Sequence, residues 1–378
     1  MRNIKTPIVS VWLYINGWFL SIIMAFVLAG VVSTYSTPFT SDTIKPLIKD
    51  LDAGELFINL LRSENHYFYT AGEDTDIYTF SDLALKLATN IQPTDTRTFL
   101  GSELPGFSIF DTEIVVAGEG TDFTTLPIES APPMDVLLKE REIANEMLKE
   151  EEDESSPPMV TGKKSVFIYH THSSEAFIPL LKGVTKANEA FSTNEKVNVV
   201  AVGKRLATEL NKHGIGVELD TTNMTEELQK KSWTYGKSYS ASRSIVQEAM
   251  ATNEDLDFLI DIHRDGQRKD ITTKMINGKP FARLFFIVGE ENKNYEQNLK
   301  IASELEVMLE QRYPGISRGV FVKGKSEGNG VYNQDLSTRA LLVEFGGVDN
   351  DLTELYNTVE VFAEIFSEYY RKAEMVNG

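Results

Sequence analysis

The chain has 378 residues, 42% of them hydrophobic and 10% aromatic, which is enough to fill at least one sizeable core in two domains of ordinary size. Acidic residues outnumber basic ones by 56 to 37, and the net charge of -19 argues against a nucleic-acid partner, because phosphate backbones bind basic surfaces. There is no cysteine, so disulfides and thiolate metal sites are excluded and any metal must be held by His, Asp or Glu.

The first predicted element is a transmembrane helix over residues 7–35. No charged residue lies between Lys5 and Asp42, and this run is long enough to cross ~30 Å of hydrocarbon as a helix. It is too long for a typical signal peptide, although cleavage within AFVLAGVVS remains an alternative. Because Arg2 and Lys5 precede the run, we expect residues 1–6 to be a short cytoplasmic tail of a single-pass protein of the cell membrane, with the remainder extracytoplasmic.

The next two segments carry no catalytic cluster. Residues 41–132 mix short helical patterns with turn-rich stretches such as GSELPGF, and we expect a small membrane-proximal domain there. Residues 133–163 are charge-dense, contain the run KEEEDE and are bracketed by Pro-Pro pairs. Such a run repels itself in a compact core, so an acidic linker or exposed helix is predicted.

From residue 164 to residue 378, strand patterns alternate with helical patterns. Strands are expected at 165–169, 214–219, 257–262, 282–289 and 340–345, and helices at 197–213, 238–251, 296–313 and 352–375. This alternation predicts an α/β fold whose mostly parallel sheet is flanked by helices. Ligands of such sheets bind at the carboxyl ends of the strands, so the residues that follow the apolar runs are the candidates for a site.

Three of these strands end in side chains that bind metals or transfer protons. VFIYHTH ends in His172, DFLIDIH ends in His263, and ALLVEFGG contains Glu344. Two imidazoles and a carboxylate, with water in the fourth position, are a common arrangement around hydrolytic zinc. We therefore expect these side chains to gather at one rim of the sheet around Zn2+, with a further ligand and a base still to be found.

The same segments resemble a known family. HTHSSEAF, DIHRDG, YNQDLS and LLVEFGGVDN resemble the stage II sporulation protein P family, membrane-anchored cell-wall hydrolases of endospore formers, and the wider pattern is similar to the zinc N-acetylmuramoyl-L-alanine amidases. The resemblance implies that His172, Glu195 and His263 bind the Zn2+ and that Glu344 is the catalytic acid-base. Without it, we would favour a helix-capping role for Glu195, because Ser192-Thr193-Asn194-Glu195 is a capping box.

Other polar residues around these motifs have supporting or alternative roles. His170 shares a strand face with His172, and we expect it to orient a ligand or substrate by a hydrogen bond rather than to bind the metal directly. His170 and Glu175 nevertheless remain substitutes for a chosen ligand. The further candidates for substrate contact or support are Arg264, Asp265, Asn333 and Gln334.

The resemblance also implies an activity and partners. The expected reaction is zinc-dependent cleavage of the amide between the lactyl group of N-acetylmuramic acid and L-alanine in peptidoglycan during engulfment, with cutting of stem-peptide cross-links as a second implied activity. The implied partners are peptidoglycan, the cytoplasmic membrane and stage II sporulation proteins D and M, and the implied location is the sporulation septum and engulfing membrane. The alternative is a catalytically weak wall-binding or scaffold protein. A zinc peptidase of another fold is disfavoured because HExxH is absent.

Overall fold

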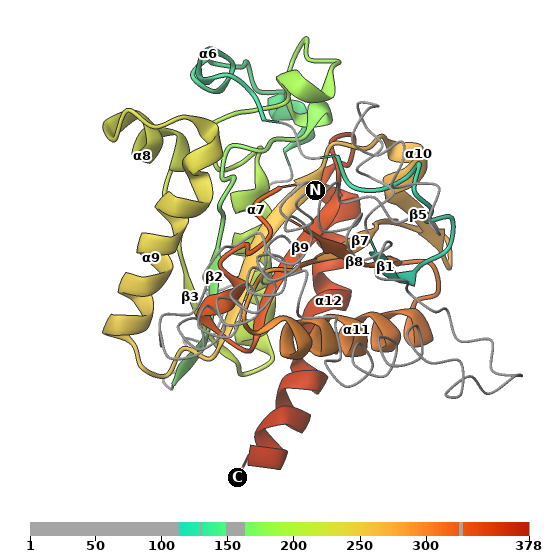
Figure 1. Cartoon of the computed structure of the whole chain (residues 1–378). Helices are drawn as coiled ribbons and strands as arrows, with labels where there is room; N and C mark the ends of the chain where they lie inside the picture. The colour runs from blue at the N-terminus through green and yellow to red at the C-terminus, as the bar shows by residue number, and fades with distance from the viewer. Residues whose placement is uncertain (1–112, 129–130, 149–162, 325–327, 378) are drawn as a thin grey trace, which may run out of the picture. The chain divides into compact units, whose positions relative to one another are not determined.

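All residues that the computed structural model describes belong to one unit, Leu100–Gly378. They are residues 113–128, 131–148, 163–324 and 328–377 (Figure 1). The expected tail and transmembrane helix, and most of the expected membrane-proximal domain, lie outside the described residues. Within the described part of the chain, none of the helices combines the length and the apolar character that crossing a bilayer requires.

A seven-stranded sheet forms the centre of this unit, in the order β1-β8-β7-β9-β4-β2-β3. Its strands are β1 (Glu113–Ala117), β2 (Lys164–Tyr169), β3 (Gly216–Leu219), β4 (Phe258–Asp265), β7 (Leu284–Gly289), β8 (Ser317–Lys323) and β9 (Ala340–Gly347). Four neighbouring strands are parallel to one another: β9, β4, β2 and β3. Strand β7 is antiparallel to β9 and parallel to β8. The edge strand β1 is antiparallel to β8. The predicted α/β fold with a mostly parallel sheet is confirmed.

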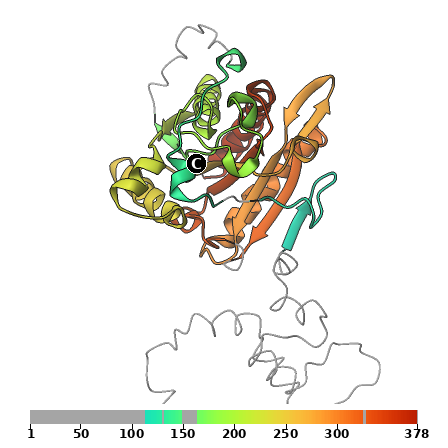
Figure 2. The same ribbon diagram turned by 90° about the horizontal axis from the view of Figure 1, so that it is seen from above.

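Helices cover both faces of this sheet. The longer ones are α7 (Val199–Lys212), α8 (Met224–Lys230), α9 (Ser238–Thr252), α11 (Tyr295–Arg312) and α12 (Leu352–Asn377). The short ones are α6 (Met134–Leu137), α10 (Lys269–Thr272), η3 (Asn145–Met147), η4 (Ile178–Leu180), η5 (Ala187–Glu189), η6 (Tyr235–Lys237) and η7 (Gln334–Leu336). A separate hairpin, β5 (Thr273–Ile276) and β6 (Lys279–Ala282), projects beside the sheet and is orange in Figure 2.

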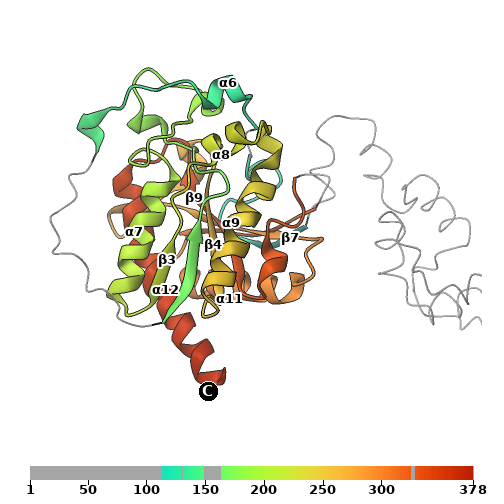
Figure 3. The same ribbon diagram turned by 90° about the vertical axis from the view of Figure 1, so that its left-hand side faces the viewer.

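The alternation of side chains along β2 explains the two layers. Val166 and Ile168 belong to the large core that α7, α11 and α12 share, whereas Phe167 and Tyr169 pack with residues of α9. Figure 3 shows α7 and α9 on opposite sides of the strands. A strand covered on both faces needs an almost continuous apolar run, as its sequence KSVFIY has.

The α/β unit also contains residues that precede the expected boundary at 164. Strand β1 pairs with β8 of the central sheet, although it falls in the expected membrane-proximal domain. In the expected linker, Leu137 is buried, Ile143 forms a β-bridge with Leu181, and the side chain of Arg141 donates to the carbonyl of Glu189. Residues 113–128 and 133–148 therefore pack with the α/β unit.

Candidate metal centre

Three buried side chains converge near the carboxyl ends of β2 and β4: His172, Glu175 and His263. Their potential ligand atoms all lie within 4.8 Å of one another. His172 Nδ1 is 3.4 Å from Glu175 Oε1, and His263 Nδ1 is 3.6 Å from Glu175 Oε2. Two imidazoles and one carboxylate match the ligand chemistry of Zn2+, so the residues present fit the metal that the motifs imply.

A tight turn after β2 brings Glu175 to the histidines. The backbone N–H of Glu175 donates to the carbonyl of His172 at 2.9 Å, which closes the turn. The carbonyl of Glu175 accepts from the N–H of Val199, at the start of α7, also at 2.9 Å. The backbone N–H of Arg264 donates to Glu175 Oε2 at 3.1 Å, which orients the carboxylate toward the group. Glu175 is thus held from β4 and from α7.

Two tyrosines, Tyr235 of η6 and Tyr239 of α9, surround the His172 ring. The Tyr235 ring stacks on it, with ring centres 4.5 Å apart, and the Tyr239 ring meets it edge-on at 5.4 Å. Both tyrosines are buried, and the His263 ring meets His172 edge-on at 4.8 Å. The sequence analysis missed these tyrosines, although their spacing of four residues in YGKSY is that of one helix face.

Each charge in this group affects the pKa of its neighbours. Burial alone would raise the pKa of Glu175, but its interactions with the His172 and His263 rings outweigh burial and hold that pKa below its usual range. Burial alone would lower the pKa of His263, but the carboxylates of Asp261 and Glu175 outweigh it and raise that pKa well above its usual value. The group therefore favours a carboxylate at Glu175 and a positive charge beside it.

Glu344 lies next to this group on β9, opposite His263 in the pairing of β9 with β4. The residue is half-buried, but its Oε2 atom is shielded from solvent, and no group in the described part of the chain hydrogen-bonds that atom. Burial, above all, raises the pKa of Glu344 to about 8. A carboxyl group with such a pKa exchanges a proton near neutral pH.

Glu195, which the resemblance implies as a ligand, lies outside this group. It lies in the turn before α7, its side chain is 41% exposed, and its carboxylate pairs with Lys204. The capping-box interpretation is wrong, because α7 begins at Val199 and the side chain of Asn198 caps it by accepting from the N–H of Val200. Glu175, kept as a substitute ligand from the sequence, is the carboxylate that lies between the two histidines.

His170 is also outside the group. Its Nδ1 donates to the carbonyl of Asp220 at 3.1 Å, and its ring packs so closely on α7 that a Cβ at Gly203 would lie 2.2 Å from Nε2. Burial lowers the pKa of His170 to about 4, so the ring is neutral. Its contacts are with the segment after β3 and with α7, and the expected role in orienting a ligand or substrate stays a prediction.

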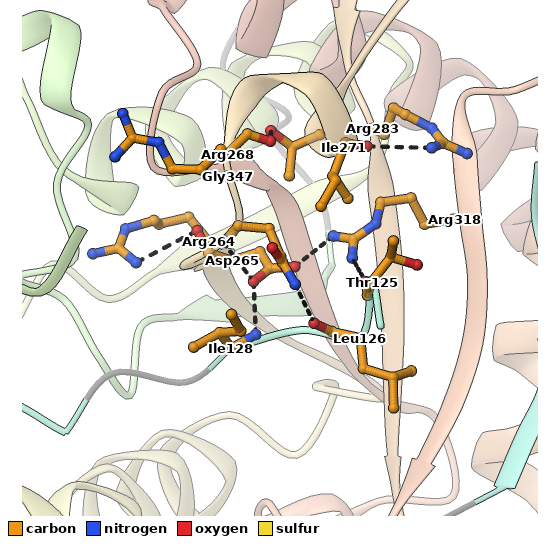
Figure 4. Close-up of polar contacts among 12 residues, drawn as sticks. Thr125, Leu126, Ile128, Arg264, Asp265, Arg268, Ile271, Arg283, Arg318 and Gly347 are labelled. Carbon is orange, nitrogen blue, oxygen red and sulfur yellow. Dashed lines mark hydrogen bonds and ion pairs between the residues drawn. The ribbon is translucent and has the colours of Figure 1, made fainter. Parts of the chain in front are cut away.

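Arg264 and Asp265 bind neighbouring backbone segments. The guanidinium of Arg264 donates to the carbonyls of Ala176 and Ala190, which fixes the loop that carries Glu175. Figure 4 shows the carboxylate of Asp265 accepting from the backbone of Ile128 and from Arg318, a buried ion pair. These two candidates support the rim of the sheet through the main chain.

Asn333 and Gln334 have a similar role. Asn333 Nδ2 donates to Ser242 Oγ on α9 at 2.9 Å. The side chain of Gln334 accepts from the N–H of Gly289 and donates to the carbonyl of Ile287, both at 2.8 Å, so it binds the end of β7. Both residues connect the segment before β9 to its neighbours.

The chain is similar in structure to two solved proteins of Clostridium difficile. It matches an N-acetylmuramoyl-L-alanine amidase from strain 630 with 17% identity and a TM-score of 0.33, over 58% of this chain and 100% of the amidase. It matches Cwp6 with 15% identity and a TM-score of 0.31, over 55% of this chain and 29% of Cwp6. TM-scores this low carry no functional argument.

The chain matches one protein family over most of its length. The family model of stage II sporulation protein P matches residues 94–367. Stage II sporulation protein P of Bacillus subtilis (strain 168) is 47% identical over 368 residues, which are 95% of this chain and 91% of that protein. The chain therefore belongs to the stage II sporulation protein P family.

Proposed function

We propose that this chain is a zinc-dependent peptidoglycan hydrolase of sporulation that cleaves the amide between the lactyl group of N-acetylmuramic acid and L-alanine. The observation that carries the proposal is the buried group of His172, Glu175 and His263 beside a carboxyl group, Glu344, whose Oε2 has no hydrogen-bond partner among the described residues. The motifs shared with cell-wall amidases support the choice of substrate, and the membership in a sporulation family supports the setting.

The metal would be held by Nδ1 of the two histidines and by the carboxylate of Glu175, the atoms that face one another in the structure. Zn2+ bound there would polarise a carbonyl and lower the pKa of a bound water. Tyr235 and Tyr239 exclude bulk water from the His172 side of the group, which strengthens every electrostatic interaction within it.

Glu344 is the acid-base group of this proposal. Its Oε2 is not engaged by another described group, and its pKa of about 8 is close to the range in which a carboxyl group both accepts and returns a proton at neutral pH. It would take a proton from the attacking water and return it to the nitrogen of the departing L-alanine. The lactyl C–N bond breaks, and a free carboxylate and a free amine remain.

The test is digestion of purified peptidoglycan by the full-length chain in detergent, with added zinc and with a chelator, followed by mass spectrometry. We expect stem peptides with a free L-alanine amine and glycans with free lactyl groups, only when metal is present. Products cut solely within the stem-peptide cross-links would replace the amidase proposal with an endopeptidase, and intact peptidoglycan with a zinc-loaded chain would favour a wall-binding protein.

A further inference from the structure

A buried carboxylate on β4 connects the two histidines of the metal centre. Asp261 is fully buried and precedes His263 by two residues, so the two side chains lie on the same face of the strand. Across the sheet, Asp261 pairs with Tyr169 at the end of β2, just before Thr171 and His172. The register of β2 and β4 therefore places this one carboxylate between both histidine segments.

The first contact of Asp261 is with His263. Its Oδ1 lies at ion-pair distance from His263 Nε2, 3.2 Å away, and in the described part of the chain no group forms a well-aligned hydrogen bond with that nitrogen. The other ring nitrogen, Nδ1, faces Glu175 Oε2. A carboxylate that receives the Nε2 proton fixes the tautomer in which Nδ1 presents its lone pair to a metal.

The second contact is with Thr171, the neighbour of His172. The backbone N–H of Thr171 donates to Asp261 Oδ1 at 2.9 Å, and its hydroxyl donates to Oδ2 at 2.6 Å. Because the Thr171 hydroxyl has one proton and donates it to Asp261, it acts as the acceptor in its 2.8 Å contact with Ser242 Oγ on α9. Asp261 thus ends a chain of hydrogen bonds that runs from the helix carrying Tyr239 to the backbone beside His172.

We propose that Asp261 is the positioning residue of the metal centre, which sets the tautomer of His263 and fixes the segment that carries His172. The proposal rests on the metal centre of the proposed function. Asp261 does not bind the metal itself: its two oxygens are occupied by Thr171 and His263. Several donors compensate its buried negative charge, and that charge in turn makes the His263 ring a stronger ligand.

The direct test compares the zinc affinity of the full-length chain with that of Asp261→Asn, measured by competition with a chromophoric chelator in the absence of peptidoglycan. The amide keeps the shape and one acceptor but loses the charge, so we expect zinc to bind about 10–100-fold more weakly. The matched control is Asp265→Asn, four residues further along β4, where the carboxylate is equally buried but pairs with Arg318. The control should keep its zinc affinity, and an unchanged affinity in Asp261→Asn would overturn the proposal.

A spectroscopic measurement on the unmodified chain keeps the test independent of whether the variants fold. With the five histidines labelled with nitrogen-15, long-range proton–nitrogen spectra of the zinc-loaded chain should show His263 protonated at Nε2 and bound through Nδ1. The reverse assignment, with zinc on Nε2, would exclude Asp261 as the acceptor. A chain that shows the expected tautomer and the affinity loss but releases no lactyl amide products would refute the proposed function and leave this inference intact.

Discussion

Glu344 lies opposite His263 in the parallel pairing of β9 with β4, so the proton-transfer candidate and a metal-binding candidate occupy adjacent strands at one edge of the sheet. Backbones of adjacent strands are about 4.8 Å apart. Glu344 can therefore reach the centre without being one of the three residues whose ligand atoms meet there. Proton transfer and metal binding should be separable by mutation.

Glu344→Gln should keep zinc and lose most of its turnover. The amide has nearly the same shape but cannot accept a proton, and general acid-base catalysis typically contributes about 10²–10⁴-fold. We expect a fall in kcat of that size with unchanged zinc content, measured by muropeptide release and metal analysis. Near-normal cleavage would remove Glu344 as the base, whereas loss of zinc would reassign it as a ligand.

Glu175→Gln and Glu195→Gln form a matched pair that tests the proposed ligand set. Glu175 is buried between two histidines, whereas Glu195 is exposed and paired with Lys204. Mutation of a residue that hydrogen-bonds to a metal ligand typically weakens metal binding about 10–100-fold. We expect Glu175→Gln to weaken zinc binding by more than this, because Glu175 is itself a proposed ligand. Glu195→Gln should bind zinc as the unmodified chain does, and the opposite ranking in a chelator competition would restore Glu195 as the ligand.

The fold class and two of the histidines followed from local patterns. Apolar runs of strand length alternating with helical periodicity predict a mostly parallel sheet, and His172 and His263 each come just after or within the end of such a run. Because the carboxyl ends of parallel strands share one edge of the sheet, their convergence could be expected without any structure.

The third member of the group could not be predicted in this way. Glu175 reaches the histidines through a turn closed by its own backbone bond to His172, and turn geometry has no periodicity to read. Asp261 lies inside an apolar run, where its role depends on Thr171, in the turn that follows β2. Strand β8 was missed for a related reason: its sequence SRGVFVK contains a buried arginine, Arg318, whose charge is compensated by the distant residues Asp265 and Thr125.

Removal of residues 1–162 should destabilise the α/β unit, although the expected domain boundary suggested otherwise. A fragment that starts at Lys163 lacks β1 and two hydrogen bonds with buried charged groups, from Ile128 to Asp265 and from Arg318 to Thr125 (Figure 4). Bonds to charged groups contribute about 1.5–3 kcal/mol each, so the free energy of unfolding should fall by about 3 kcal/mol or more. Urea unfolding of this fragment and of one that starts at Leu100 measures the difference, and equal stabilities would show that residues 113–128 are dispensable.

Glu306 on α11 should make the stability of the protein fall as pH rises. Burial, followed by repulsion from Glu310, raises its pKa from 4.5 to about 7 in the folded protein. The folded state holds the Glu306 proton more tightly than the unfolded state does. The contribution of this carboxyl group to the free energy of unfolding is therefore complete below pH 4.5 and is lost as pH rises through about 7. Glu306→Gln removes the cost of ionising this buried carboxyl group, so the Tm of the variant should exceed that of the unmodified chain by a few degrees at pH 8 and by much less at pH 4.5.

Thermal unfolding at both pH values measures this difference in Tm, with Glu248→Gln, at an exposed position on α9, as the control. A Tm difference for Glu306→Gln that is the same at both pH values would mean that its carboxyl group titrates alike in the folded and unfolded chains.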